Sequence, residues 1–178
     1  MPRRPHLTPI NRSSAATRQS AERAALVMRA AIALGGATLL MAGCGPDPVK
    51  IAVPEPAPEV AQVCTGLIQA MPAKVLDGKR RKTEPSSALT TAYGDPPIEV
   101  TCGVTPPAGM AEAQSQCFEV NGVGWFAKEV TNGVIFTTIG REVYLEVAVP
   151  AKYTPEANAL TDVSDAVKAH NTLITPCT

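Results

Sequence analysis

The sequence has few of the side chains on which most enzyme mechanisms depend. Its 178 residues include 2 histidines, and aromatic residues make up 4% of the chain. The motifs Gly-x-Ser-x-Gly, His-Glu-x-x-His and Ser-x-x-Lys are absent, as is a phosphate-binding glycine loop. The one histidine beyond residue 43, His170, is more typical of a packed or capping residue than of a general base. A carboxylate pair such as Asp95 with Glu99 is more typical of solvated surface. We therefore expect no enzyme activity and no cofactor.

The chain also lacks a net charge, because 16 Lys+Arg balance 16 Asp+Glu. Residues 1–43 hold 6 of these basic residues and 1 of the acidic ones, which leaves 10 against 15 in residues 44–178. That part of the chain therefore carries a charge of about −5. Acidic proteins are repelled by nucleic-acid phosphates, so we expect no nucleic-acid partner.

No apolar run is long enough to span a bilayer, which takes about 20 residues, but residues 30–41 form a shorter one. Residues 1–29 before it hold six arginines and one acid. A basic region, a short apolar core and small residues before a cleavage point are typical of a secretory signal peptide. Cys44 directly follows Leu40-Met41-Ala42-Gly43, a pattern typical of a bacterial lipobox, although leucine is more usual than Met41.

We therefore expect the chain to be cut before Cys44 and its thiol to carry a lipid such as palmitate. Two acyl chains hold a protein firmly on a membrane, whereas one holds it only marginally. The expected location is the outer face of the cell membrane. In the alternative, the segment is a plain signal peptide or a marginal transmembrane anchor. Because Met28-Arg29 by itself begins a compact lipoprotein signal, we expect translation to start near Met28, with residues 1–27 an artefact of the gene model.

Four cysteines remain after Cys44, an even number that predicts two disulfides in an exported protein. They are Cys64, Cys102, Cys117 and Cys177. Their spacing fits neither a Cys-x-x-Cys redox motif nor a zinc site, so no metal is expected. Of three connectivities we favour Cys102 with Cys117 and Cys64 with Cys177.

The remaining chain predicts a proline-rich tether over 44–59 and one α+β domain over 60–178. Proline at positions 46, 48, 54, 56 and 58 favours an extended spacer. Apolar residues at helical spacing between Cys64 and Met71 predict a short first helix. A second helix is expected from Pro155 to about Asn171, with Thr154 as its N-cap. Between them we expect a brief strand at 74–76 and an antiparallel meander of about five strands, drawn from 88–93, 98–104, 117–120, 123–130, 134–139 and 142–149.

Several side chains are candidates for binding. The run Lys79-Arg80-Arg81-Lys82 suits lipid phosphate or an anionic polymer, or is a solvated loop. Asp95, Trp125 and Arg141 lie at expected loops and strand ends, where recognition tends to occur. Arg141 has the fork geometry that pairs with a carboxylate or phosphate, and its alternative role is an internal salt bridge, for instance to Asp95. The alternative role of Trp125 is core packing.

A family resemblance rests on several segments taken together. They are Cys64-Thr65-Gly66-Leu67, Met71-Pro72, Gly78-Lys79-Arg80-Arg81, Tyr93-Gly94-Asp95-Pro96-Pro97-Ile98, Cys102-Gly103-Val104, Cys117, Val120-Asn121-Gly122-Val123-Gly124-Trp125, Thr137-Thr138-Ile139-Gly140-Arg141 and Cys177. With these the chain resembles an actinobacterial family of exported proteins and lipoproteins, the domain-of-unknown-function family 3515. Some members of that family use a transmembrane helix where this chain has a lipobox. The resemblance implies an envelope location and supplies no activity or ligand.

Three functions remain open on the sequence. The first is a lipid-anchored envelope protein whose domain binds or scaffolds an envelope protein, lipid or glycan. The second is a carrier or sensor of a small amphipathic ligand held between the sheet and the helices. The third is an enzyme of unfamiliar mechanism.

Overall fold

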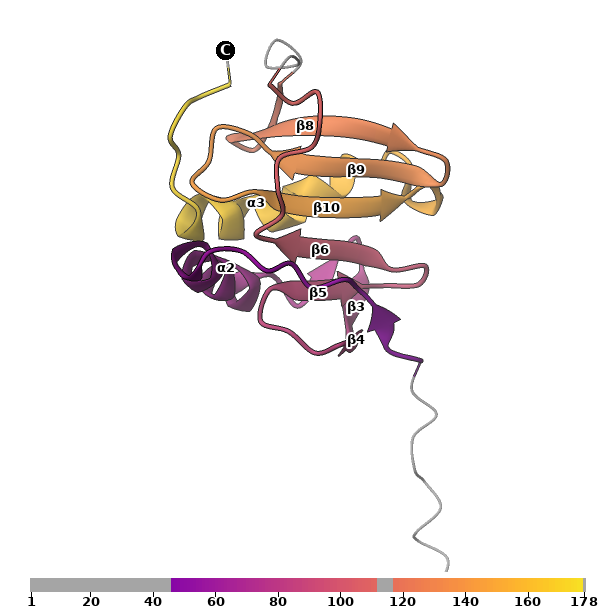
Figure 1. Ribbon diagram of the computed structural model, residues 1–178. Helices are drawn as coiled ribbons and strands as arrows, with labels where there is room; N and C mark the ends of the chain where they lie inside the picture. Colours follow the sequence, from indigo (N-terminus) through magenta and orange to yellow (C-terminus); the bar gives the residue numbers. More distant parts are fainter. Residues whose placement is uncertain (1–45, 112–116, 178) are drawn as a thin grey trace, which may run out of the picture. The chain divides into compact units, whose positions relative to one another are not determined.

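The fold is built on an antiparallel sheet whose last strand returns to the middle. The computed structural model describes residues 46–111 and 117–177, and Figure 1 shows the sheet. Eight strands lie in the order β2-β3-β5-β6-β10-β9-β8-β7, and all neighbours pair antiparallel. They are β2 (Lys74–Val75), β3 (Gly78–Arg81), β5 (Thr90–Tyr93), β6 (Ile98–Cys102), β7 (Phe118–Val120), β8 (Val123–Val130), β9 (Gly133–Thr138) and β10 (Leu145–Pro150). A separate parallel pair is formed by β1 (Val49–Lys50) and β4 (Thr83–Glu84).

The α+β class is confirmed, but the expected sheet of about five strands is too small. The brief strand expected at 74–76 is present as the edge strand β2. The strand of this sheet that was not expected is β3, whose sequence Gly-Lys-Arg-Arg has none of the apolar alternation by which strands are recognised. The chain turns from β2 into β3 through Leu76 and Asp77, whose φ angles are 46° and 63°. The expected meander is also wrong in its order, because β10 lies between β6 and β9.

One turn follows directly from the sequence. Asn121 and Gly122 have φ angles of 49° and 78°, and they join β7 to β8 with Val120 opposite Val123. A tight hairpin turn of this kind needs positive φ at both central residues, which Asn-Gly adopts at little cost. The hairpin expected at this position is therefore confirmed.

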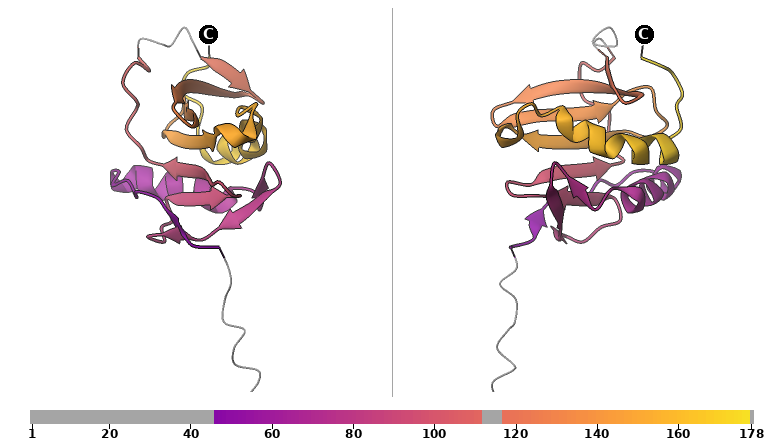
Figure 2. Two further views of the ribbon diagram at one scale, coloured as in Figure 1. Left: turned by 90° about the vertical axis from the view of Figure 1, so that its right-hand side faces the viewer. Right: turned by 180° about the vertical axis from the view of Figure 1, so that it is seen from behind.

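Two helices complete the two-layer domain. They are α2 (Pro58–Ala70) and α3 (Asn158–His170), with a short 3₁₀ helix, η2 (Ala151–Tyr153), before α3. Figure 2 shows α3 lying along one face of the sheet, and α2 packs beside α3 and against β6. Trp125 of the sheet, Leu67 of α2 and Leu160 of α3 are fully buried in one core. Burial of such side chains contributes roughly 1.5–3 kcal/mol each, which makes this layer contact the main source of stability.

The second helix begins later than expected, at Asn158 rather than Pro155. The hydroxyl of Thr154 donates to the carbonyl of Ala151 at 2.8 Å and to the Glu156 carboxylate, so it caps no helix. The backbone N–H of Asn158 bonds to the carbonyl of Pro155, three residues back, so the chain enters the helix through a tighter turn. His170 is exposed, so it is not the packed residue that was one of the two expectations for it.

The segment expected to be a tether is largely part of the domain. The compact unit begins at Asp47, earlier than the start expected near Val60. The N–H of Val49 donates to the carbonyl of Lys82 at 2.9 Å, which helps to pair β1 with β4. Val49 and Ile51 are buried together against Ala92. Alternating apolar residues thus hold this stretch on the domain despite its prolines.

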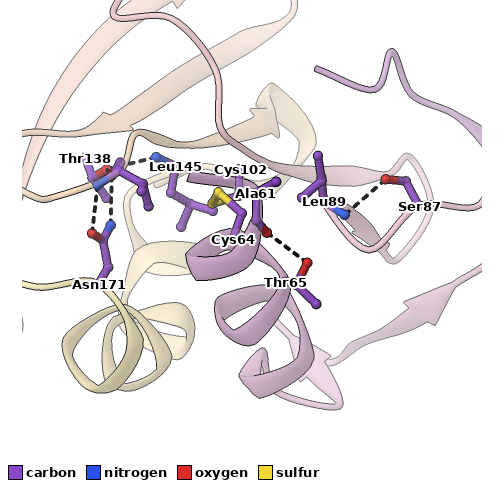
Figure 3. Close-up of a disulfide and its surroundings, with 10 residues drawn as sticks. Ala61, Cys64, Thr65, Ser87, Leu89, Cys102, Thr138, Leu145 and Asn171 are labelled. Atoms are coloured by element: carbon purple, nitrogen blue, oxygen red, sulfur yellow. Dashed lines mark hydrogen bonds between the residues drawn. A yellow bond between two sulfur atoms is a disulfide. The ribbon is translucent and has the colours of Figure 1, made fainter. Parts of the chain in front are cut away.

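All four expected cysteines form disulfides, but the favoured pairing is wrong. The bonds join Cys64 to Cys102 and Cys117 to Cys177. Figure 3 shows the first bond, which joins α2 to the end of β6. Cys102 and Cys117 cannot pair, because the sheet places β6 and β7 four positions apart. The two closures span 38 and 60 residues, and a loop-entropy model assigns about 4 kcal/mol to each.

Within the parts of the chain that the structure describes, none of the helices has both the length and the hydrophobicity needed to cross a bilayer.

Candidate functional site

Arg141 is a buried structural residue in this fold. Its side chain donates from Nη1 to the carbonyl of Asn171 at 2.9 Å and from Nη2 to the carbonyl of Gly122 at 2.8 Å. Burial lowers the pKa of its guanidinium, and the charge of Glu119 partly opposes that shift. Arg141 thus ties the chain after α3 to the β7–β8 hairpin, and it forms no ion pair with Asp95.

Trp125 is fully buried in the core between the sheet and the helices. Its exposed fraction is 0%, so its ring offers no surface to a ligand. Of the two roles considered for Trp125, core packing is the one that the structure supports.

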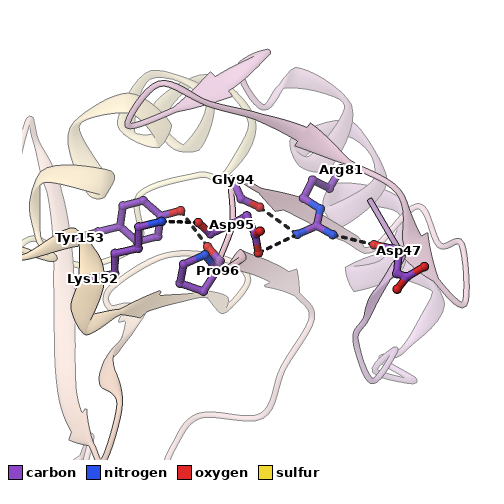
Figure 4. Close-up of polar contacts among 7 residues, drawn as sticks. All are labelled: Asp47, Arg81, Gly94, Asp95, Pro96, Lys152 and Tyr153. Carbon is purple, nitrogen blue, oxygen red and sulfur yellow. Dashed lines mark hydrogen bonds and ion pairs between the residues drawn. The ribbon is translucent and has the colours of Figure 1, made fainter. Parts of the chain in front are cut away.

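Asp95 lies in a polar network around Arg81, drawn in Figure 4. Its carboxylate is 3.5 Å from Nη1 of Arg81, and the side chain of Asp95 is 87% exposed. The same Nη1 donates to the carbonyl of Gly94, and Nη2 donates to the carbonyl of Asp47 at 2.6 Å. Lys152 donates to the carbonyl of Asp95. Arg81 thus joins β1, β3 and the β5–β6 turn, and Asp95, Trp125 and Arg141 do not form one site.

Arg80 donates hydrogen bonds to carbonyl groups at the end of α2 and just after it. Its Nη2 donates to the carbonyl of Met71 at 2.7 Å and approaches the hydroxyl of Tyr93 at 3.3 Å. That hydroxyl in turn donates to the carbonyl of Pro72. Carbonyl groups at a helix C-terminus lack partners within the helix, so a cation there is favourable. Two of the four residues of the basic run thus have internal contacts as well as charge.

A groove lies beside this run, and we call it the basic groove. It has a volume of about 490 Å³. Its polar lining consists of Gln69, Arg80, Arg81, Lys82, Thr83, Ser86, Ser87, Thr90 and Thr91. Three cations and six neutral polar side chains, five of them hydroxyls, face one open space, and no carboxylate lines it. Such a lining suits an anionic group, because guanidinium and hydroxyl donors bind phosphate or carboxylate oxygens.

Two donors at the basic groove have no partner among the described residues. Thr90 is 4% exposed, and its Oγ1 makes no hydrogen bond there. The Nε of Arg81 is likewise buried and unpaired. Buried polar groups are nearly always hydrogen-bonded, so unpaired ones call for an explanation such as a ligand. Both residues line the groove, whereas the other buried unpaired atoms of the described residues, Nε1 of Trp125, Oγ1 of Thr137 and Nε of Arg141, belong to residues that do not.

A second groove, of about 510 Å³, lies between the segment 51–56 and the sheet face opposite α3. Two half-buried carboxylates line it, Glu99 of β6 and Glu146 of β10. Burial raises the pKa of Glu99, and the charge of Glu146 raises it further. Burial also raises the pKa of Glu146, against the charge of Lys128. The expected surface pair of Asp95 with Glu99 is replaced by Glu99 with Glu146, on neighbouring strands.

Within residues 46–111 and 117–177, no group of three or more His, Cys, Asp or Glu side chains is placed to hold a metal ion. Cys44, the expected lipidation site, lies outside the described residues.

Sequence reasoning found the cations of the basic groove and missed its hydroxyls. The run of four charges was visible, whereas Ser86, Ser87 and Thr90 carry no motif. A Ser-Ser pair between a proline and a strand is typical of any turn. Only the return of β5 beside β3 brings those hydroxyls to the charges.

The geometry defines a class of protein: a small disulfide-bonded α+β domain with a basic groove at one end of its sheet. The chain belongs to the family described as "Protein of unknown function (DUF3515)", whose sequence model matches residues 23–173. Comparison with curated proteins and with solved structures finds no match.

Replacing Arg141 by Ala is expected to lower the free energy of unfolding by about 3 kcal/mol. The reason is that the carbonyls of Asn171 and Gly122 then lose a charged donor, and each buried unpaired group costs about 1–3 kcal/mol. Urea unfolding of the variant and of the exposed control Lys168→Ala measures the difference. An unchanged midpoint for Arg141→Ala would contradict the structural role.

The carboxylates Glu99 and Glu146 are expected to make the domain more stable as the pH falls from 7 toward the ordinary carboxyl value of 4.5. Their pKa values are raised by folding, so the folded state binds more protons than the unfolded state in this window, and stability is lost as the pH rises through it. Glu99→Gln should therefore raise the stability at pH 7 and flatten the pH dependence. Thermal unfolding from pH 4 to 8 tests this, with Glu129→Gln as the exposed control; equal slopes for both variants would contradict it.

Proposed function

We propose that the protein is a lipid-anchored component of the cell envelope whose domain binds an anionic partner and performs no catalysis. The observation that carries the binding role is the basic groove, with three cations and the unpaired hydroxyl of Thr90. An anionic group bound there would accept the hydrogen bond that this hydroxyl lacks.

The envelope location is supported by the sequence before the domain and by the disulfides within it. Residues 1–43 have the charge and hydropathy pattern of a signal peptide, and Cys44 follows the lipobox pattern. Disulfides persist in oxidising compartments outside the cytosol, and this domain contains two. We also propose that the family is actinobacterial and that its members include lipoproteins.

The charge distribution favours a compact anionic group over a long polyanion. Residues 44–178 carry about −5 overall, so a long polyanion would meet repulsion beyond the groove. A single phosphate or carboxylate needs only the local cations.

A binding role is favoured over a carrier role by how the core is packed. A carrier of a small amphipathic ligand would need an enclosed apolar cavity between the sheet and the helices. In the described part of the chain, Leu67, Trp125 and Leu160 fill that space and are fully buried. The basic groove, in contrast, is open and polar.

Cys44→Ser is expected to move the protein from the membrane fraction to the medium or wash and to abolish incorporation of an alkyne-labelled palmitate. Serine has no thiol for the lipid, and the apolar core before it is too short to span the bilayer. Membrane fractionation and in-gel detection of the label measure both effects. Met41→Leu, which restores the usual lipobox leucine, should keep the protein in the membrane; Cys44→Ser remaining there would refute the lipid anchor.

Thr90→Val is expected to weaken the binding of glycerol phosphate by about 3- to 10-fold without lowering stability. The change removes one hydrogen bond to the ligand, a bond worth about 0.5–1.5 kcal/mol, and it also removes a hydroxyl that is unpaired in the domain. Calorimetry on the detergent-solubilised protein measures the affinity. The isosteric control is Thr137→Val, another buried threonine with an unpaired hydroxyl. Equal affinities for wild type, Thr90→Val and Thr137→Val would exclude the basic groove as the site.

A further inference from the structure

We propose that the anionic partner is the phospholipid surface that holds Cys44, so that the domain lies on the bilayer with the β2–β3 hairpin and the basic groove toward the headgroups. This inference rests on the proposed lipid anchor and names the source of the anionic group. It follows from the length of the chain before the domain, from where that chain is attached and from where the charges lie.

The chain between the lipid and the domain is very short. Asp47, the first residue of the compact unit, is three residues after Cys44. Three extended residues span at most about 11 Å. A free spacer over 44–59 would instead have reached about 45 Å in an extended polyproline conformation. The docking of β1 therefore removes most of the reach that the sequence alone suggests.

The point of attachment is beside the basic run. Nη2 of Arg81 holds the carbonyl of Asp47 at 2.6 Å, as Figure 4 shows, and the carbonyl of Lys82 accepts from Val49. A lipid on Cys44 would thus bring this end of the domain to within about 11 Å of the membrane. That distance is little more than the Debye length, which is about 8 Å at physiological salt. Charges at that distance interact with lipid phosphates.

The charges are unevenly divided along the chain. Residues 74–82 hold 5 of the 10 Lys+Arg that follow residue 43, and only 1 of the 15 Asp+Glu. The rest of residues 44–178 therefore holds 5 basic residues against 14 acidic ones. An anionic surface attracts the first part and repels the second, which orients the domain as well as holding it.

The register of the hairpin supports an external anion. Lys74 and Lys79 lie directly opposite each other in the β2–β3 pair, and both are exposed. Like charges directly opposite on a sheet are destabilising. Lipid phosphates between and around the two ammonium groups would remove that repulsion. Lys82, also exposed, lines the basic groove at the end of the same run.

The first experiment uses the lipidated protein in vesicles of phosphatidylcholine, alone or with about one third phosphatidylglycerol. A membrane-impermeant amine reagent labels the lysines, and peptide mass spectrometry measures each site. Lys74, Lys79 and Lys82 should label several-fold less in the anionic vesicles, whereas the controls Lys128 and Lys168 should not change. Salt at 1 M, where the Debye length is about 3 Å, should restore the labelling. Equal labelling of all five lysines in both vesicles would overturn the proposal.

The second experiment uses residues 44–178 with Cys44→Ser, so that neither the basic leader nor a lipid contributes to vesicle binding. Lys79→Gln with Lys82→Gln should weaken cosedimentation with anionic vesicles by about 25-fold, from about fivefold for each lysine near the surface. The matched double variant Lys128→Gln with Lys168→Gln, which removes the same charge, should bind like its parent. Equal weakening by both pairs would show that vesicle binding depends on net charge alone, and it would overturn the oriented contact.

The outcomes separate this inference from the function on which it rests. A lipidated Cys44 with uniform lysine labelling overturns the membrane contact and leaves the anchored binding module standing. An unlipidated Cys44, read from the mass of the N-terminal peptide, overturns both. A third outcome is that glycerol phosphate binds the groove more tightly than the vesicles do and does not displace the chain from the vesicles. In that case the source of the anion is a soluble ester and not the bilayer.

Discussion

The contacts of Arg81 determine how the N-terminal segment, the sheet edge and the basic groove are arranged. One guanidinium holds the carbonyl of Asp47 and the carbonyl of Gly94 and lies beside the Asp95 carboxylate. A planar guanidinium presents donors in fixed directions, so it fixes several segments at once in a way that lysine does not. Through it the chain that enters the domain lies along β3 and β4 instead of extending from them.

The docked N-terminal segment also forms one wall of the second groove, on the sheet face opposite α3. Residues 51–56 run over the face that α3 leaves uncovered, and Glu99 and Glu146 are half-buried beneath them. The cost of burying two carboxylates is seen in their raised pKa values. The domain thus has basic residues at the sheet edge near its N-terminal end and two half-buried carboxylates under residues 51–56. In our proposal, the binding function and the orientation on the membrane both depend on this separation of charge.

Part of the fold follows from local patterns and part does not. The Asn121-Gly122 hairpin, the α+β class and the participation of all four cysteines in disulfides were predicted, because each depends on residues close in sequence or on a simple count. The pairing of the cysteines was wrong, since it depends on β10 lying between β6 and β9. The role of Arg141 depended on contacts 19 and 30 residues away along the chain, and those are invisible to spacing. Only the charges of the basic groove were predicted, because its hydroxyls come from β4, from β5 and from the loop between them, and they carry no motif.

The difference between what the sequence determines and what the tertiary structure decides is clearest for the reactive and charged side chains. By itself the sequence determined that catalytic motifs are absent, that positive charge is concentrated in one short run, and that a cysteine follows an apolar leader. These are properties of composition and local order, which folding does not alter. Only the tertiary structure decided that the proline-rich stretch is docked, that Asp95 contacts Arg81 rather than Arg141, and that Trp125 is core. Each of these depends on which distant segments the burial of apolar surface brings together, and local spacing does not encode that.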